Sequence, residues 1–367
     1  MFNQQFAGRR VLVTGHTGFK GSWLSLWLRT LGAEVSGYAL DPASPLDLFS
    51  EVAGHAVSCD TRGDLRDLQK LRDCIATLQP EFIFHLAAQA LVRRSYKDPL
   101  ETFSVNALGT AHLLEAVRES GRACIVIVVT SDKCYENREW DFAYREDDPL
   151  GGHDIYSMSK AATELVAQAW RRSFFAREGG CVHIATVRAG NVLGGGDYAE
   201  DRIVPDSIRS LERGEAITVR NPGATRPWQH VLEPLSGYLW LAAELSAGRH
   251  GELSCAFNFG PGPESNRSVG ELVQEIVKSW PGGVTHLEQS EQLHEASRLN
   301  LAIDKAVARL KWAPVWKFAE TVERTVAWYY ARHVTKSINM LDFTLGQIEA
   351  YAQAASARHI CWATSPK

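Results

Sequence analysis

One short segment decides the fold of this chain: Val11-Leu12-Val13-Thr14-Gly15-His16-Thr17-Gly18-Phe19-Lys20-Gly21. The apolar start is typical of a strand that stops at Gly15, and a helix-like stretch follows over residues 22–31. Glycines at intervals of three in this context indicate a dinucleotide-binding turn, because they allow a tight turn, a close pyrophosphate and close packing of the helix. The spacing does not fit a P-loop, and an ordinary glycine turn is the alternative. We expect the dinucleotide to contact Gly15, Thr17, Gly18, Phe19, Lys20 and Gly21.

Two carboxylates downstream are candidates for the adenosine half of that dinucleotide. Asp41 ends the expected second strand, about 20 residues after the glycine turn, where a carboxylate accepts the ribose hydroxyls. Such a carboxylate would repel a 2′-phosphate, which favours NAD over NADP. A loop cap before Pro42 is the alternative for Asp41. Asp64, followed by Leu65, is the second candidate and would lie at the adenine edge.

Strand and helix patterns alternate through the first half of the chain. We expect strands over 11–13, 34–40, 82–86 and 124–129, and helices over 22–31, 65–78 and 107–119. Short continuous apolar strands between helices indicate a parallel sheet that is covered on both faces. Right-handed crossovers then predict a Rossmann-type, doubly wound α/β domain.

The pattern loses its regularity after about residue 187. Loops rich in Gly and Pro at 194–197 and 221–227 alternate with a short strand at 216–220 and a helix at 269–280. We therefore expect a smaller α/β lobe that binds substrate. The predicted division is a dinucleotide domain over 1–187 plus about 228–258, a lobe over about 188–227 plus 259–335, and a C-terminal tail over 336–367.

The composition bounds the partners and the compartment. The chain has 367 residues, 45% of them hydrophobic and 22% charged, and its net charge of −4 gives no general attraction for nucleic acid or anionic lipid. The N-terminus does not resemble a secretory signal, and the apolar runs are too short to span a membrane. Seven scattered cysteines without a C-x-x-C pair predict neither a disulfide framework nor a zinc site and suit the cytoplasm. We expect no metal.

A tyrosine and a lysine form the first half of a candidate catalytic site. Tyr156 and Lys160 are four residues apart, which places them on one face of a helix. The segment 130–133 follows strand 124–129 at its carboxyl end, where open α/β sheets place their sites. A neighbouring ammonium and a cationic nicotinamide stabilise a phenolate, so Tyr156 can act as a base. Ser131 can bridge a substrate oxygen to the phenol.

These segments resemble the extended short-chain dehydrogenase/reductase family of NAD-dependent epimerases and dehydratases, and most closely its CDP-glucose 4,6-dehydratases. The matches run through most of the chain and comprise 14–24, 85–89 (His-Leu-Ala-Ala-Gln), 130–135 (Thr-Ser-Asp-Lys-Cys-Tyr), 151–154, 188–192 with Asp197, 226–231 and 339–341. The resemblance implies that Leu86, Ala87 and Ala88 also contact the cofactor NAD, together with Tyr156 and Lys160.

The resemblance also implies a reaction, the dehydration of CDP-glucose to CDP-4-keto-6-deoxyglucose in deoxysugar and polysaccharide biosynthesis. Tyr156 would take the 4-hydroxyl proton while hydride passes from C4 to NAD, water would leave across C5–C6, and the hydride would return to C6. Elimination needs an acid and a base, for which related dTDP-glucose dehydratases use Asp and Glu. Here Asp132 is the candidate acid in a closed pocket. Lys133 replaces the Glu, and would be the base only if neutral or would otherwise stabilise an enolate.

Local cations must hold the nucleotide sugar, because the chain as a whole is negative. The candidates for the diphosphate are Arg202, Arg220 and Arg226, and the resemblance adds Asn191. Gln89 and Arg94 follow strand 82–86 and are expected at the sugar. His230 is either a ligand contact or a structural histidine.

Some features depart from the resemblance or leave it open. Ile155 stands where the family usually has Pro, and Met158 is bulkier than the common residue. A nucleotide-sugar 4-epimerase, a dehydratase of another nucleotide hexose and a catalytically silent dinucleotide-binding protein are the alternatives. Asp132 and Lys133 favour the dehydratase, because an epimerase needs no elimination pair. The family implies a homodimer or a dimer of dimers, formed through long helices that include 161–170.

Overall fold

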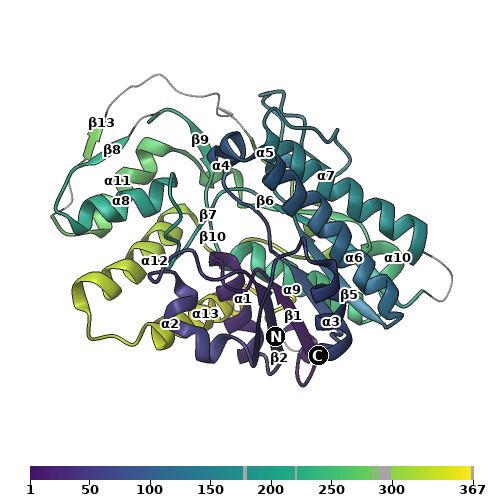
Figure 1. The fold of residues 1–367 in the computed structure, drawn as a ribbon. Coiled ribbons are helices and arrows are strands. Elements are labelled where there is room, and N and C mark those ends of the chain that lie inside the picture. The colour runs from purple at the N-terminus through teal and green to yellow at the C-terminus, as the bar shows by residue number, and fades with distance from the viewer. Residues whose placement is uncertain (177–179, 220, 283–284, 288–298, 365–367) are drawn as a thin grey trace.

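The computed structural model describes residues 1–367 except 177–179, 220, 283–284, 288–298 and 365–367. Its centre is a seven-stranded parallel sheet in the order β11-β6-β5-β4-β1-β2-β3 (Figure 1). The strands are β1 (Arg10–Thr14), β2 (Glu34–Ala39), β3 (Cys59–Arg62), β4 (Phe82–His85), β5 (Cys124–Val129), β6 (Val182–Ala189) and β11 (Ala256–Phe259). This arrangement confirms the predicted Rossmann-type doubly wound sheet.

The strand order reverses direction between β1 and β4. The chain moves outward from β1 to β2 and β3, and then crosses back to place β4 on the other side of β1. A crevice opens at such a reversal, outside the carboxyl ends of the strands. The glycine turn follows β1 and the segment 86–88 follows β4, so both lie at this crevice.

Helices cover both faces of the sheet (Figure 1). Apolar side chains of one core join the sheet to helices α1, α2, α9, α12 and α13, and those of a second core join its other face to α3, α6 and α7. The helices of the first group are α1 (Phe19–Thr30), α2 (Leu48–Ala56), α9 (Leu232–Ser246), α12 (Phe318–Tyr330) and α13 (Met340–Ala357). Those of the second group are α3 (Leu68–Leu78), α6 (Gly109–Ser120) and α7 (Ile155–Trp170). The shorter α4 (Val92–Lys97) and α5 (Pro99–Phe103) follow β4, and α10 (His250–Leu253) lies between α9 and β11.

Short elements beyond the carboxyl edge of the sheet enclose the crevice from the other side. Helices α8 (Ile203–Glu212) and α11 (Val269–Ser279) lie there with three two-stranded pairs (Figure 1). The pairs join β7 (Val192–Leu193) to β10 (Gln229–His230), β9 (Thr225–Pro227) to β12 (Asn266–Ser268), and β8 (Ile217–Val219) to β13 (Thr285–Leu287). The exact division into two domains and a tail stays a prediction.

The C-terminal segment packs into the main core. Trp362 is fully buried and its ring stacks on Phe2 at 4.9 Å, so the two ends of the chain meet. Glu233 on α9 accepts hydrogen bonds from the Val315 and Trp316 amides and from the Tyr351 hydroxyl of α13, at 2.6 to 2.9 Å. The tail therefore supports the helix layer behind the sheet.

Candidate active site

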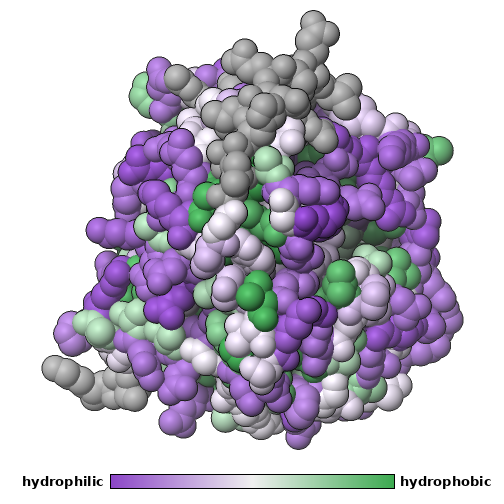
Figure 2. Space-filling model, turned by 90° about the vertical axis from the view of Figure 1, so that its left-hand side faces the viewer, coloured by the Kyte–Doolittle hydropathy of each residue, from purple (hydrophilic) through white to green (hydrophobic). Residues whose placement is uncertain are grey.

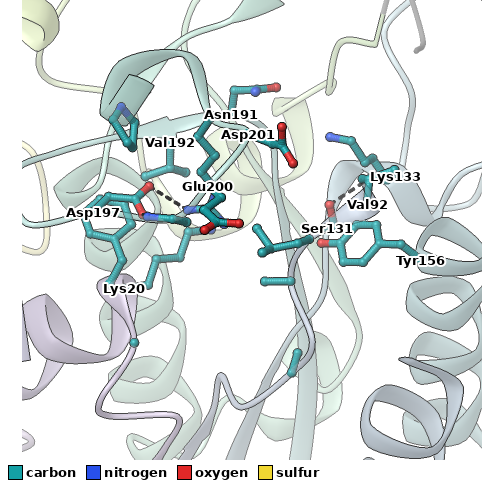
Figure 3. A pocket seen from close by; sticks show the side chains of 18 of the residues that line it. Lys20, Val92, Ser131, Lys133, Tyr156, Asn191, Val192, Asp197, Glu200 and Asp201 are labelled. Carbon is teal, nitrogen blue, oxygen red and sulfur yellow. Dashed lines mark hydrogen bonds and ion pairs between the residues drawn. The ribbon is translucent and has the colours of Figure 1, made fainter. Parts of the chain in front are cut away.

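A large cleft lies at the reversal between β1 and β4. Its volume is about 1530 Å³, and residues of the sheet domain and of the smaller elements line it together. In the close-up, Lys20 and Asp197 lie on one wall and Ser131, Lys133 and Tyr156 on the other (Figure 3). The cleft therefore brings together the glycine turn and the predicted catalytic residues, which are far apart in the sequence.

The glycine turn has the shape that a dinucleotide requires. Gly15 has a φ of +74°, and a Cβ there would lie 2.6 Å from the Ala87 nitrogen. A Cβ on Gly21 would lie 2.1 Å from the Gly15 oxygen, so α1 can begin this close to the turn only with glycine. At Gly18, by contrast, a Cβ would meet only the Gly15 oxygen, at 3.4 Å, and the residue is exposed to the cleft. The turn therefore leaves its backbone open to a pyrophosphate at the start of α1.

The two predicted adenosine contacts differ in their placement. Asp64 and Leu65 line the cleft, and Arg66 binds the Asp64 carboxylate and lowers its pKa through hydrogen bonds. Asp41 lies just beyond the lining, with its side chain 87% exposed and 3.6 Å from Arg62. Asp41 therefore reaches a ribose only if its side chain turns inward, and its role stays a prediction.

The redox pair lies on the first turns of α7. Asp154 caps this helix by accepting the Ser157 amide at 2.9 Å, so Ile155 can replace proline at the helix start. Burial raises the pKa of Tyr156 to about 12, and a hydrogen bond with Ser131 opposes this. Burial lowers the pKa of Lys160 to about 8, and its ammonium donates to the Val129 carbonyl at 3.5 Å. The two shifts move the pKa values of the phenol and the amine apart, because burial favours the neutral form of each group.

Ser131 connects the phenol to the elimination pair. Its hydroxyl donates to Asp132 Oδ1 at 2.9 Å and accepts the Lys133 amide at 3.3 Å. The Lys133 ammonium lies 3.6 Å from the same Asp132 oxygen. Asp132 is 1% exposed, and a Cβ on Gly190 would lie 3.1 Å from its other oxygen. The carboxylate thus sits in a closed position between a hydroxyl and an ammonium.

Several cations line the cleft together with carboxylates, and they are available to a diphosphate. Lys20, Arg202 and Arg226 line the cleft with Lys133 and Lys160. Burial and the nearby Arg202 lower the pKa of Lys20 to about 8. Asp197 holds Arg202 through a 2.6 Å ion pair. Asn191 also lines the cleft, and its buried amide oxygen has no hydrogen-bond partner among the described residues.

Several predicted substrate contacts do not line the cleft. Gln89 is buried and its side chain bonds to Leu91 and Thr102, which shapes the loop after β4. Arg94 points to Glu101 at 2.8 Å, whereas the adjacent Arg93 lines the cleft. His230 is fully buried, and burial lowers its pKa to about 3, which matches the structural histidine. Arg220 lies outside the described residues.

Two ion pairs of the cleft could not be inferred from the sequence. Arg93 on α4 pairs with Asp201 of the opposite wall at 2.9 Å, so one ion pair joins the two sides of the cleft. Asp197, which the sequence named only as part of the family resemblance, holds the predicted Arg202 in an ion pair. Neither pairing follows a regular spacing, which is why the tertiary structure was needed to find it.

The sequence of this chain is similar to those of known nucleotide-sugar dehydratases. The family model described as GDP-mannose 4,6 dehydratase matches residues 12–325. The chain belongs to the GDP-mannose 4,6 dehydratase family. It is 50% identical over 328 residues to a CDP-glucose 4,6-dehydratase of Salmonella typhimurium, a match that covers 88% of this chain and 91% of the relative. This confirms the family resemblance seen in the motifs.

Two solved structures support the same placement. One is a dTDP-glucose 4,6-dehydratase of Streptomyces venezuelae with NAD bound, at 25% identity and a TM-score of 0.73, covering 90% of this chain and 99% of the other. The second is MoeE5 in complex with UDP-glucose and NAD, at 26% identity and a TM-score of 0.70, covering 88% and 98%. Among the described residues of this dehydratase-family chain, no cluster of Asp, Glu, His or Cys side chains could hold a metal ion. In the same part of the chain, no helix is both long enough and apolar enough to cross a membrane.

The buried Lys160 makes this family member's stability depend on pH in a definite direction. Because its folded pKa is about 8 rather than 10.5, the unfolded chain binds more protons between these values, and stability rises with pH across this window. Below pH 8 the buried ammonium costs on the order of 3 kcal/mol. We expect Lys160→Met to unfold at higher denaturant concentration than the nucleotide-free wild type at pH 7, with the difference shrinking from pH 8 to 10.5.

Chemical denaturation of both chains over this pH range measures the effect. The matched control is Lys278→Met on the exposed surface of α11, which should change stability by less than about 0.5 kcal/mol at pH 7. A Lys160→Met chain that is less stable than the wild type at pH 7 would contradict the assigned burial cost.

Proposed function

We propose that this chain dehydrates CDP-glucose to CDP-4-keto-6-deoxyglucose with NAD as its cofactor, which makes it a hydro-lyase. The observation that carries the proposal is the Ser131-Asp132 contact at 2.9 Å beside Tyr156, because it joins an elimination acid to the redox phenol. Sequence identity of 50% to a CDP-glucose 4,6-dehydratase supports the same reaction. Two similar solved structures, a dTDP-glucose 4,6-dehydratase and MoeE5, contain NAD, which supports the cofactor.

The open glycine turn and the redox pair fit the dinucleotide. When bound, NAD would take up hydride from C4 of the sugar and return it to C6. Tyr156 accepts the proton of the 4-hydroxyl, and Lys160 stabilises the phenolate by its charge. Since burial raises the pKa of Tyr156 to about 12, the hydrogen bond between Tyr156 and Ser131 and the positive charges of the cleft must favour the anion.

Asp132 and Lys133 serve the elimination step in this proposal. The C4 ketone acidifies the C5 proton, which a base removes while the C6–O bond breaks. Asp132 gives its proton to the departing hydroxide, so that water leaves. The Lys133 nitrogen lies 3.6 Å from Asp132. As an ammonium it stabilises the enolate, and as a neutral amine it removes the C5 proton.

The protons of the proposed reaction balance within the site. The 4-hydroxyl gives up one proton to Tyr156, and the leaving water needs one proton from Asp132. Ser131 contacts both Tyr156 and Asp132, so it can pass the proton of the 4-hydroxyl from Tyr156 toward Asp132, which supplies the proton of the leaving water. The C5 proton is removed and later replaced, and the overall products are the 4-keto-6-deoxy sugar nucleotide and one water.

Cleft cations are available for the sugar diphosphate. Arg202 and Arg226 offer guanidinium groups that can bind phosphate oxygens in a bidentate manner. The unpartnered amide oxygen of Asn191 can accept a hydroxyl of the sugar or the ribose. Cytidine itself rests on the 50% identical relative, because no base-reading residue stands out among the described residues that line the cleft.

We also propose a cytoplasmic homodimer. Exposed apolar side chains gather on adjacent elements of one side, namely Tyr96, Leu100, Phe103, Leu108 and Leu165 of α4, α5, the turn after it and α7. The opposite side is largely hydrophilic, with only small separate apolar groups (Figure 2).

Light scattering should give twice the chain mass of 40.7 kDa, and a monomer mass would contradict the dimer. All seven cysteines are free thiols, which suits a reducing compartment.

The direct test of the proposed activity is incubation with CDP-, dTDP-, UDP- and GDP-glucose in parallel. We expect CDP-glucose to be converted fastest to a 4-keto-6-deoxy product, which develops ultraviolet absorbance in alkali and shows loss of one water by mass spectrometry. The protein as purified should contain NAD, and no added oxidant should be needed. Recovery of only a 4-epimer, or bound NAD without turnover of any sugar nucleotide, would contradict the dehydratase assignment.

A further inference from the structure

Beneath the cleft lies a buried ion pair to which the reaction assigns no chemical step. Arg188 on β6 binds Glu164 on α7 through two hydrogen bonds of 2.9 Å, from Nε to Oε1 and from Nη2 to Oε2. The two side chains are only 3% and 4% exposed. Neither side chain lines the cleft, so this pair cannot contact the substrate.

The pair reaches both ends of the segment that carries the elimination residues. Thr130 donates its hydroxyl to Glu164 Oε1 at 2.5 Å. At the other end, Arg188 donates to the Tyr135 hydroxyl at 2.7 Å and its guanidinium lies 4.8 Å from the centre of the Tyr135 ring. Residues 131–134 lie between these two attachment points, so their position depends on the ion pair.

The same pair is fixed to the helix that carries the redox residues. Glu164 follows Lys160 by four residues, and Lys160 follows Tyr156 by four, so all three lie on one face of α7 in successive turns. Lys160 in turn donates to the carbonyl of Val129, directly before Thr130. The face of α7 that presents the phenol is thus the face from which the ion pair holds residues 130–135.

The energetics favour a role in geometry over one in stability. A buried ion pair costs desolvation, and apolar residues of similar volume are often as stable or more so. Here each carboxylate oxygen of Glu164 accepts two hydrogen bonds: Oε1 from Thr130 and Arg188 Nε, and Oε2 from Thr186 and Arg188 Nη2. A buried network with all its hydrogen bonds made rigidifies its surroundings. A network of this kind allows one arrangement of its attached segments.

We propose that Glu164 and Arg188 form a clamp that sets the position of Ser131, Asp132 and Lys133 relative to Tyr156 and Lys160. This inference rests on the proposed function, because it concerns the transfer of protons between the redox and elimination groups. Glu164 and Arg188 are positioning residues that touch neither substrate nor cofactor. A small displacement of reacting groups can cost about 100-fold in rate, so the clamp affects turnover more than substrate binding.

Two threonines allow a matched test of the clamp. Thr130 and Thr186 are both buried, and each gives one short hydrogen bond to Glu164, at 2.5 and 2.6 Å. Only Thr130 adjoins the segment 131–134, whereas Thr186 lies within β6. We expect Thr130→Val to lower kcat by about 10-fold to 100-fold with the KM for CDP-glucose within about two-fold. Thr186→Val should keep kcat, Thr130→Ser should restore it, and both valine variants should lose a similar amount of Tm.

The wild-type protein, measured in the same assay, separates this proposal from the proposed function. If the wild type converts another of the four sugar nucleotides instead, the function is corrected and the variants are compared on that substrate. Equal losses of kcat in Thr130→Val and Thr186→Val, an unchanged Thr130→Val, or a loss that appears in KM would overturn the clamp. Where Thr130→Val does not fold, Tyr135→Phe releases the other end of the segment, and it should lower kcat while the content of bound NAD stays constant.

Discussion

The close approach of the turn after β1 to the segment after β4 is the constraint on which the rest of this structure depends. Gly15 lies so near Ala87 that a Cβ would come within 2.6 Å of its nitrogen, and Gly21 brings α1 equally close to the turn. The reversal of strand order opens the crevice at this place. The same arrangement directs the ends of β5 and β6 to the other wall, so dinucleotide turn and catalytic residues face one cleft.

A second feature of the cleft is a local group of cations around the buried Lys20. In a chain with a net charge of −4, Lys20 lies close enough to Arg202, Lys133 and Lys160 to interact with their charges. The carboxylates of Asp132 and Asp197 also line this part of the cleft. Burial lowers the pKa of both Lys20 and Lys160 to about 8, which shows the cost of this arrangement. Such a concentration of cations is unfavourable in the empty cleft and becomes favourable with phosphates bound. Stability at this site is therefore exchanged for binding and proton transfer.

The sequence predicted the elements whose pattern is local. The strand Cys124–Val129 has its predicted bounds because it is a continuous apolar run, and the glycine turn is recognisable from spacing alone. The polar edge strand β3 (Cys59–Arg62) and the short α4 and α5 were missed, since an edge strand needs no apolar pattern and short helices leave little periodicity. The predicted contacts Gln89, Arg94 and His230 follow the right segments but turn away from the cleft. Side-chain direction depends on tertiary partners such as Thr102 and Glu101, which no spacing reveals.

In the proposed reaction Tyr156 and Lys160 perform the redox step, while Asp132 is needed only for the loss of water. The most direct test is a single turnover of the NAD-loaded Asp132→Asn variant with CDP-glucose, followed by the absorbance of reduced NAD. Because hydride leaves C4 but no acid assists the departure of the 6-hydroxyl, we expect reduced NAD to accumulate and the 4-keto-6-deoxy product to form at least about 100-fold more slowly than in the wild type. Product formation at the wild-type rate, or an absence of NAD reduction in the folded variant, would contradict this prediction.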